Sequence, residues 1–343
     1  MRGGKYNGVG KIELTEFDKP VVREGTVLIK NIRAGICGTD LHAYLEEGDS
    51  VGIMPGNQFG HEMVGVIEEV GEGVEGFEAG QKVFVNPTTF REYPEGWNFT
   101  MSADMAGAFS EYILVEDPQW DYNLFKLPED IDINYLALTE PLSVSMNGVM
   151  LAEPKKEDKA IVYGAGTIGL ACLTALKYCG VEEVIVADSV PLRLEAVEKL
   201  GGIPCDITKM PTNEFAVERW GSSTGNLGQQ TNLADLVFDC AGYPKAIDDY
   251  LEYAMPNSKL ICIAMGNSPT EITSTEIVAK MITIIGSAGY TPEVIVKVLE
   301  MLAAGTDVSP LITDVFPLSE ITTAFDEAAK GDQNIKVLID HSK

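Results

Sequence analysis

Cysteine, histidine and glutamate occur together in two short segments near the start of the chain. Cys37 and His42 belong to the segment CGTDLH, and His61 and Glu62 belong to GHE, both beside glycine. A soft thiolate, an imidazole and a carboxylate form a ligand set that suits Zn²⁺, and three protein ligands leave one position open for water or substrate. These segments therefore indicate a catalytic zinc site.

A further carboxylate and a third histidine complete the list of candidates. Glu140 lies in TEPL, where a helix is expected to start, and could add a second carboxylate to the site. His341 lies in the terminal tail and is expected to be exposed and without a role. Each of these residue types also has a structural alternative to metal binding. A lone cysteine is usually a small buried hydrophobe, and a lone histidine is usually a hydrogen-bonding group.

A glycine-rich turn indicates a nucleotide site. Gly164, Gly166 and Gly169 of GAGTIG follow the apolar run AIVY and open a helical pattern. The first glycine permits the tight turn, the second lets a pyrophosphate approach the backbone, and the third allows close packing of helix on strand. The next apolar run ends in Asp188, whose carboxylate can accept hydrogen bonds from both ribose hydroxyls and repels a 2′-phosphate. NAD is therefore expected rather than NADP, although Arg193, five residues on, weakens this preference.

The sequence shows two different hydrophobic patterns, which predict the elements that position these residues. Up to about residue 130, short β-branched runs alternate with glycine turns, which predicts an antiparallel β body. From residue 159, continuous apolar runs alternate with helical stretches, which predicts a parallel sheet covered by helices. The polar segment 210–232 is expected to be a surface excursion between strands, and two amphipathic helices and a strand are expected after residue 290.

Composition narrows the class of protein. A chain of 343 residues favours two domains, and 45% hydrophobic content is typical of a globular protein. With 25 basic and 52 acidic residues the net charge is −27, which disfavours nucleic acid and anionic membranes as partners. The sequence shows no apolar run long enough to span a membrane and no signal peptide pattern, and its six cysteines form no CxxC pair. A reducing cytoplasm is the expected location.

The order of the motifs resembles a known family. GICGTDLH, PGNQFGHE, TEPLSV and YGAGTIG followed by Asp188 resemble the zinc-dependent medium-chain dehydrogenases, most closely the polyol branch of sorbitol, butanediol and threonine dehydrogenases. The resemblance implies an α/β protein in which a GroES-like β-rich catalytic domain (1–148 and 290–343) receives an inserted Rossmann NAD-binding domain (149–289) with a doubly wound parallel sheet.

The same resemblance assigns roles to the candidate residues. Cys37, His61 and Glu62 match the catalytic zinc ligands, and Glu140 matches a residue that either ligates or exchanges with water at the metal. Glu62 is therefore counted among the catalytic residues as well. Thr39 matches the hydroxyl that relays the substrate proton.

Two neighbours of Thr39 also have counterparts in the family. Asp40 matches the carboxylate that holds the metal-ligating histidine. His42 lies where relatives often carry a histidine near the relay, and a structural hydrogen-bonding role is an equal alternative. The cofactor-binding residues implied by motif and resemblance are Gly164, Gly166, Thr167, Ile168, Gly169, Asp188, Arg193, Ala264, Gly266, Gly286 and Ser287.

One departure from the family concerns a second metal. Relatives commonly bind a structural zinc through four cysteines in a lobe after GHE, but residues 86–107 contain no cysteine. One catalytic zinc and no structural zinc are therefore expected. A homodimer or homotetramer is expected from the resemblance and from the apolar run MITIIGSAGY, which could form an edge strand.

Three hypotheses for function follow. The leading one is a zinc- and NAD-dependent oxidoreductase that interconverts a secondary alcohol, diol or polyol and its ketone by hydride transfer. The second is a ketone or aldehyde reductase of the same family, and the third is a non-catalytic nucleotide-binding protein. The joint presence of Cys37, Thr39, His61 and Glu62 favours an enzyme acting on a small alcohol or ketone.

Overall fold

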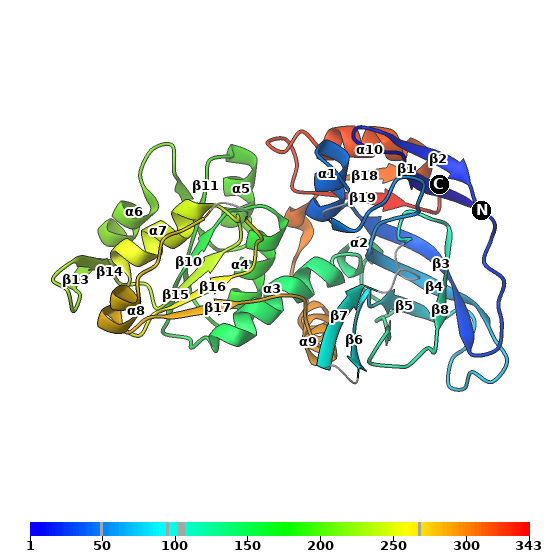
Figure 1. Cartoon of the computed structure of the whole chain (residues 1–343), viewed down its shortest axis with the longest axis horizontal. Coiled ribbons are helices and arrows are strands. Elements are labelled where there is room, and N and C mark those ends of the chain that lie inside the picture. Colours follow the sequence, from blue (N-terminus) through cyan, green and yellow to red (C-terminus); the bar gives the residue numbers. More distant parts are fainter. Residues whose placement is uncertain (49–50, 94–95, 102–106, 267–268) are drawn as a thin grey trace. The chain divides into compact units, whose positions relative to one another are not determined.

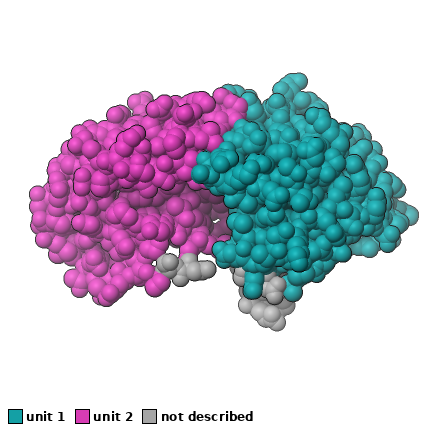
Figure 2. Space-filling model, turned by 90° about the horizontal axis from the view of Figure 1, so that it is seen from above, with its two compact units in different colours: residues 1–140, 291–305, 312–343 teal, residues 141–290, 306–311 magenta. Residues whose placement is uncertain are grey.

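The protein consists of two compact units. The computed structural model describes residues 1–48, 51–93, 96–101, 107–266 and 269–343, and of the side chains those outside 88–106. Unit 1 comprises Met1–Glu140, Thr291–Gly305 and Ile312–Lys343, and unit 2 comprises Pro141–Tyr290 and Thr306–Leu311 (Figures 1 and 2). The first change of unit therefore lies at residue 140, eight residues before the expected boundary of 148. Within the described ranges, no helix is long and apolar enough to cross a membrane.

Unit 1 is built on a mostly antiparallel sheet. In the part of the chain that the structure describes, this sheet has seven strands, with β8 pairing on β3 beside the path β18-β19-β3-β4-β5-β9. The strands are β3 (Thr26–Gly35), β4 (Glu62–Val70), β5 (Lys82–Val85), β8 (Tyr112–Glu116), β9 (Leu124–Lys126), β18 (Ile312–Pro317) and β19 (Lys336–Asp340). The long strand β3 pairs with β4 over most of its length, with β8 through residues 26–30 and with β19 through residues 33–35. The first and last parts of the chain thus share one sheet.

Smaller elements complete unit 1. Two antiparallel pairs are β1 (Arg2–Tyr6) with β2 (Ile12–Glu16), and β6 (Thr88–Tyr93) with β7 (Gly96–Met101). The second pair occupies the segment that lacks cysteine. The helices are α1 (Gly38–Leu45), α2 (Ile133–Leu136), α9 (Pro292–Ala303) and α10 (Ile321–Ala328).

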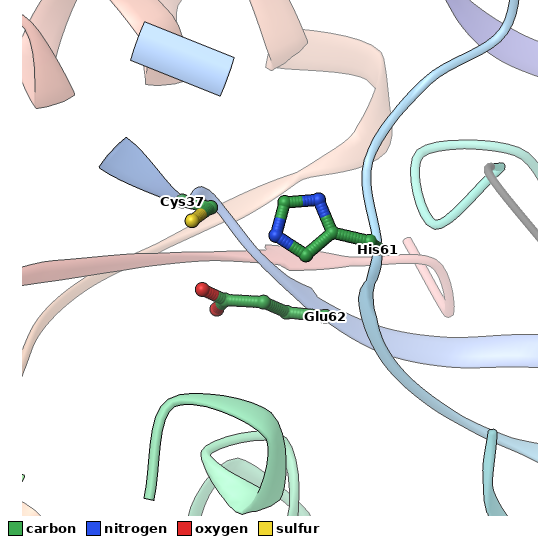
Figure 3. Close-up of side chains that lie close together, drawn as sticks. All are labelled: Cys37, His61 and Glu62. Atoms are coloured by element: carbon green, nitrogen blue, oxygen red, sulfur yellow. The ribbon is translucent and has the colours of Figure 1, made fainter. Parts of the chain in front are cut away.

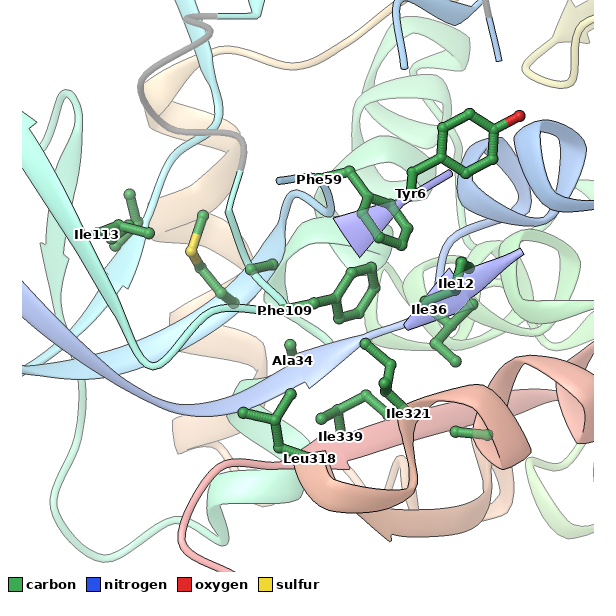
Figure 4. Close-up of a cluster of buried hydrophobic side chains, with 14 of the residues drawn as sticks. Tyr6, Ile12, Ala34, Ile36, Phe59, Phe109, Ile113, Leu318, Ile321 and Ile339 are labelled. Carbon is green, nitrogen blue, oxygen red and sulfur yellow. The ribbon is translucent and has the colours of Figure 1, made fainter. Parts of the chain in front are cut away.

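An aromatic cluster forms the centre of the unit 1 core (Figure 4). Phe59 and Phe109 meet edge to face with ring centroids 4.9 Å apart, and Phe325 of α10 lies 5.4 Å from Phe109. Gly60 follows Phe59 with φ +90°, and a Cβ at Gly60 would meet the Phe109 ring at 2.6 Å. Because only glycine fits there, the core fixes the backbone directly before His61.

Unit 2 has the Rossmann arrangement. Six of its described strands form one parallel sheet in the order β12-β11-β10-β15-β16-β17, which is the doubly wound order. The strands are β10 (Lys159–Tyr163), β11 (Glu183–Asp188), β12 (Ile203–Asp206), β15 (Leu236–Asp239), β16 (Lys259–Cys262) and β17 (Thr283–Gly286). The helices are α3 (Thr139–Ala152), α4 (Thr167–Tyr178), α5 (Pro191–Lys199), α6 (Thr212–Trp220), α7 (Pro244–Tyr253) and α8 (Ser274–Lys280).

The polar segment 210–232 is more ordered than the sequence suggested. It forms α6 and a hairpin of β13 (Ser222–Thr224) and β14 (Gln230–Asn232). Asn232 and Asn213 are both buried, and the Nδ2 of Asn232 donates to the Oδ1 of Asn213 at 2.8 Å. The segment still lies between strands β12 and β15, with β13 exposed, and its two buried amides are hydrogen-bonded inside the unit.

The prediction for His341 was wrong. The side chain is only 6% exposed, next to the Arg33–Asp340 ion pair, whose Nη1 and Oδ1 atoms are 2.8 Å apart. Burial lowers the pKa of His341 to about 4, so the imidazole is neutral. Its position at the end of β19, a central strand of the sheet, explains the burial.

Candidate metal centre and dinucleotide site

The register between β3 and β4 brings the predicted metal ligands together. Gly35, at the end of β3, pairs with Glu62, at the start of β4, and Cys37 follows two residues after Gly35. One ligand atom each from Cys37, His61 and Glu62 lies within 4.8 Å of the others. Figure 3 shows the three side chains converging from the two neighbouring backbone segments.

The donor set fits a zinc ion. His61 and Glu62 are buried and Cys37 is half-buried, so a thiolate, an imidazole and a carboxylate share a site with little access to water. Burial lowers the pKa of His61, but the negative charges of Cys37, Asp40 and Glu140 outweigh it and raise this pKa well above its usual value. A centre with this excess of negative groups attracts a cation.

Glu140 lies beside this cluster rather than within it. The side chain is 7% exposed in the first turn of α3, and its charge acts on His61 and on Lys336. It is not among the residues whose ligand atoms lie within 4.8 Å of one another in the described part of the chain. Its role as a further or exchanging ligand stays a prediction.

Asp40 was expected to hold the metal-ligating histidine, but the structure gives it a different contact. Its Oδ2 accepts a hydrogen bond from the backbone N–H of Cys37 at 2.9 Å, and its Oδ1 has no hydrogen-bond partner among the described residues. Burial raises the pKa of Asp40 to about 6. Asp40 therefore fixes the loop that carries Cys37 and acts on His61 through its charge.

Thr39 and His42 lie on α1, directly after the predicted metal ligand Cys37. Thr39 is half-buried in the first turn. The His42 side chain is 32% exposed, and its Nδ1 lies 3.6 Å from the Oε2 of Glu46 one turn later. His42 thus has a local partner at the surface of the unit, and both relay roles stay predictions.

Lys336 is a site residue that the sequence analysis missed. Its Nζ donates to the Oε1 and Oε2 of Glu62 at 2.8 and 2.7 Å and to the carbonyl of Ile36 at 2.9 Å. Lysine is usually exposed, so its residue type did not indicate a buried partner for Glu62. The available signal was its place in IKVLID, an apolar run expected to form a buried strand.

The glycine turn of unit 2 fits a dinucleotide. Gly164 has φ +93°, and a Cβ at Gly169 would lie 1.8 Å from the carbonyl oxygen of Gly164. A Cβ at Gly166 would meet nothing within 4 Å, so this glycine leaves space at the N-terminus of α4, which begins with Thr167 and Ile168. The three glycines therefore meet the three requirements of tight turn, open approach and close packing.

Asp188 ends β11 beside this turn. Its Oδ2 accepts from the N–H of Ala165 at 2.7 Å, and its Oδ1 accepts from the N–H groups of Ser189 and Val190 at 2.8 and 2.9 Å. The Nη1 of Arg193 lies 3.7 Å from the Oδ2 of Asp188. The structure thus brings both residues together with the glycine turn.

The remaining predicted cofactor residues follow the carboxyl ends of β16 and β17. Ala264 and Gly266 come after β16, and a Cβ at Gly266 would lie 2.3 Å from the carbonyl oxygen of Gly242. Gly286 ends β17, and the Oγ of Ser287 accepts from the Nδ2 of Asn147 at 2.9 Å. The carboxyl ends of all strands in a parallel sheet lie on the same side. These residues therefore lie on the same side of the sheet as the glycine turn, where doubly wound sheets bind ligands.

Known proteins resemble the chain over nearly its whole length. The family models of the alcohol dehydrogenase GroES-like domain and of the zinc-binding dehydrogenase match residues 23–129 and 167–304. A sorbitol dehydrogenase of Arabidopsis thaliana is 30% identical, with 96% of this chain and 93% of that protein aligned.

Two solved structures have the same fold. The crystal structure of 2R,3R-butanediol dehydrogenase from Bacillus subtilis has a TM-score of 0.85 at 28% identity, covering 99% of both chains. An alcohol dehydrogenase of Escherichia coli CFT073, solved with NADH, has a TM-score of 0.84 at 26% identity, again covering 99% of both chains. The chain therefore belongs to the zinc-dependent medium-chain dehydrogenase family, in its polyol branch, and is an oxidoreductase.

Proposed function

We propose that this enzyme uses NAD to interconvert a secondary alcohol of a diol or polyol and the corresponding ketone. The observation that supports this most is the buried cluster of Cys37, His61 and Glu62, in a chain whose glycine turn is complete. The relatives named for butanediol and sorbitol indicate the substrate class.

A screen of substrates tests this function. Butanediols, sorbitol, threonine and simple primary and secondary alcohols are supplied with NAD, and NADH formation is recorded against the Cys37→Ala variant as background. A diol or polyol is expected to give the highest kcat/KM. Activity confined to primary alcohols, or equal in the variant, would contradict the proposal.

The residues of unit 1 would divide the chemistry as follows. Cys37, His61 and Glu62 hold a zinc ion, with Glu140 beside them, and a bound zinc supplies Lewis acidity toward the substrate oxygen. Thr39, two residues after Cys37, would relay the proton of the substrate hydroxyl, accepting it while donating its own hydroxyl proton onward. His42 lies three residues later on the same helix face and is partly exposed, so it can pass this proton toward solvent.

The cofactor preference depends on Asp188. NAD supplies the hydride acceptor, and a 2′-phosphate near this carboxylate would be repelled by like charge at a cost on the order of a few kcal/mol. The ratio of specificity constants for NAD and NADP should therefore strongly favour NAD. A preference for NADP would mean that Arg193 dominates the local charge.

The proposed metal content is one catalytic zinc per chain. The segment between β5 and β8 contains no cysteine, so it offers no thiolate for a structural zinc. Elemental analysis should return about one zinc per chain after removal of loosely bound metal. A value near two would show a second site that the sequence does not reveal.

A symmetric oligomer is proposed from unit 2. β17 forms an edge of the parallel sheet, and α8 before it exposes Val278 at 74%, next to Met281 at 54%. An edge strand with apolar neighbours can pair with its own copy about a two-fold axis. Light scattering at micromolar protein should give the mass of a dimer or tetramer, and a monomeric mass would refute it.

The six free cysteines support a reducing, cytoplasmic location.

A further inference from the structure

A buried ion pair lies directly against the proposed metal centre. The side chains of Lys336 and Glu62 are 3% and 1% exposed, and Nζ lies 2.7 Å from Oε2. In the described part of the chain, the Nζ of Lys336 donates its hydrogen bonds to Glu62 and to the backbone next to Cys37.

The geometry of this pair uses all the protons of the ammonium group. A lysine ammonium has three N–H donors, and Lys336 directs two to the two oxygens of Glu62 and one to the carbonyl of Ile36. Ile36 directly precedes Cys37. Lys336 therefore connects the carboxylate of one proposed ligand to the backbone beside another.

The Glu62 carboxylate is also confined from the side of β3. A Cβ at Gly35 would lie 2.1 Å from the Oε2 of Glu62, so the carboxylate occupies the space that a side chain at position 35 would fill. Gly35 is paired with Leu338 of β19, two residues after Lys336. Three neighbouring strands thus hold Glu62 in one place.

We propose that Lys336 is a positioning residue that restrains Glu62, so that the metal centre keeps an open coordination position for the substrate. This rests on the metal centre proposed above. The ammonium competes with a metal for the same carboxylate lone pairs, and its charge repels a divalent cation. With Lys336 removed, both oxygens of Glu62 become available to the metal, and the site approaches the closed coordination of a structural zinc site.

The test compares Lys336→Met with the wild-type protein, each loaded with zinc or with cobalt(II). The variant should release zinc to a chelator about tenfold or more slowly, within the range by which such outer partners alter metal sites. Its cobalt(II) absorption spectrum should change, because a second Glu62 oxygen joins the coordination, and its kcat should fall while its Kd for NAD stays constant. Faster zinc release, or an unchanged cobalt spectrum, would overturn the proposal. If Lys336 had only a structural role, its loss would weaken the metal site and speed the release of zinc.

Lys280→Met is the matched control for losing a buried lysine. Lys280 is 6% exposed in α8 of unit 2, where its Nζ donates to the carbonyl of Leu251. This control can lower the melting temperature but should leave zinc release and the cobalt spectrum unchanged. If it altered them as Lys336→Met does, the effect would not be specific to Glu62 and the proposal would fail.

A second pair of variants covers the case in which Lys336→Met does not fold. Glu62→Gln and the double variant with Lys336→Met leave no unpaired carboxylate at position 62. If Lys336 sets the coordination through Glu62, the two proteins share one cobalt(II) spectrum, whereas a difference between their spectra would overturn the proposal. Loss of metal on Cys37→Ala in the wild-type background separately tests the metal centre itself.

Discussion

Single side chains near the metal centre have environments that the sequence could not reveal. Cys37, His61 and Glu62 were predictable because rare residue types stood in two characteristic segments. Lys336 lies 274 positions from Glu62, so only the pairing of β19, β3 and β4 makes them neighbours. The sequence also did not reveal the partner of Asp40, which accepts a hydrogen bond from the backbone of Cys37 and not from the histidine that the family pattern suggested.

Thr39 provides the test of the proton relay. Thr39→Ala should retain zinc and NAD but lower kcat by about 10²-fold or more, the range for a lost proton-transfer group. Thr39→Ser keeps the hydroxyl and should retain most activity. Steady-state kinetics with parallel zinc analysis check this, and wild-type turnover in a zinc-loaded alanine variant would direct attention to His42 or Glu140.

His341 should make stability depend on pH. Its pKa is about 4 in the folded protein and 6.5 in a free side chain, so the unfolded chain binds a proton that the folded one rejects. The stability is present above pH 6.5 and is lost as pH falls toward 4, by roughly 3 kcal/mol. The facing groups are Arg33, Asp340 and Glu111.

The variant His341→Asn isolates this contribution, because asparagine does not titrate. Urea unfolding between pH 7 and pH 4 should show a smaller loss of free energy in the variant than in the wild-type protein. Asp340, with its pKa of about 2, stays ionised over this range and affects both proteins alike. Parallel pH curves would contradict the assignment.

Strands and helices were the most predictable level of the fold. Continuous apolar runs gave the parallel strands of unit 2, as at β10 and β11, because burial on both faces leaves no room for alternation. The register shifts between β3 and β4 left no mark in the sequence pattern, and neither did the division of β3 between β8 and β19. Segment 210–232 lies between the parallel strands β12 and β15, as predicted, but its buried residues Asn213 and Asn232 could not be told from loop residues by type.

The glycine turn before α4 allows a matched pair of substitutions. A Cβ at Gly166 meets nothing within 4 Å, so Gly166→Ala should fold normally yet bind NAD about tenfold or more weakly, because the methyl group occupies the approach of the pyrophosphate. A Cβ at Gly169 would lie 1.8 Å from the Gly164 oxygen, so Gly169→Ala should destabilise the protein by roughly 1–3 kcal/mol. Fluorescence titration and thermal melting separate the two effects, and a reversed pattern would contradict this interpretation of the turn.

The predicted metal site and the predicted cofactor site lie in different compact units of the chain. The predicted metal ligands all lie in unit 1, whereas the predicted cofactor residues, from Gly164 to Ser287, all lie in unit 2. The order of motifs anticipated this layout, but the first boundary falls at residue 140, inside helix α3. A hydrophobicity pattern does not reveal such a boundary, because α3 continues as one helix through it.

This separation gives the last prediction. Cys37→Ala removes the thiolate, so bound zinc should fall from about one per chain to near zero and turnover should vanish. The Kd for NAD should stay within about twofold, because the glycine turn and Asp188 belong to unit 2 with its own core. Cys179→Ala, a half-buried cysteine at the end of α4, is the control and should keep both zinc and activity. Elemental analysis, NAD titration and melting curves are needed on all three proteins. A Cys37→Ala protein that kept stoichiometric zinc would place the metal elsewhere, and a folded one that lost NAD binding would show that the two sites are not independent.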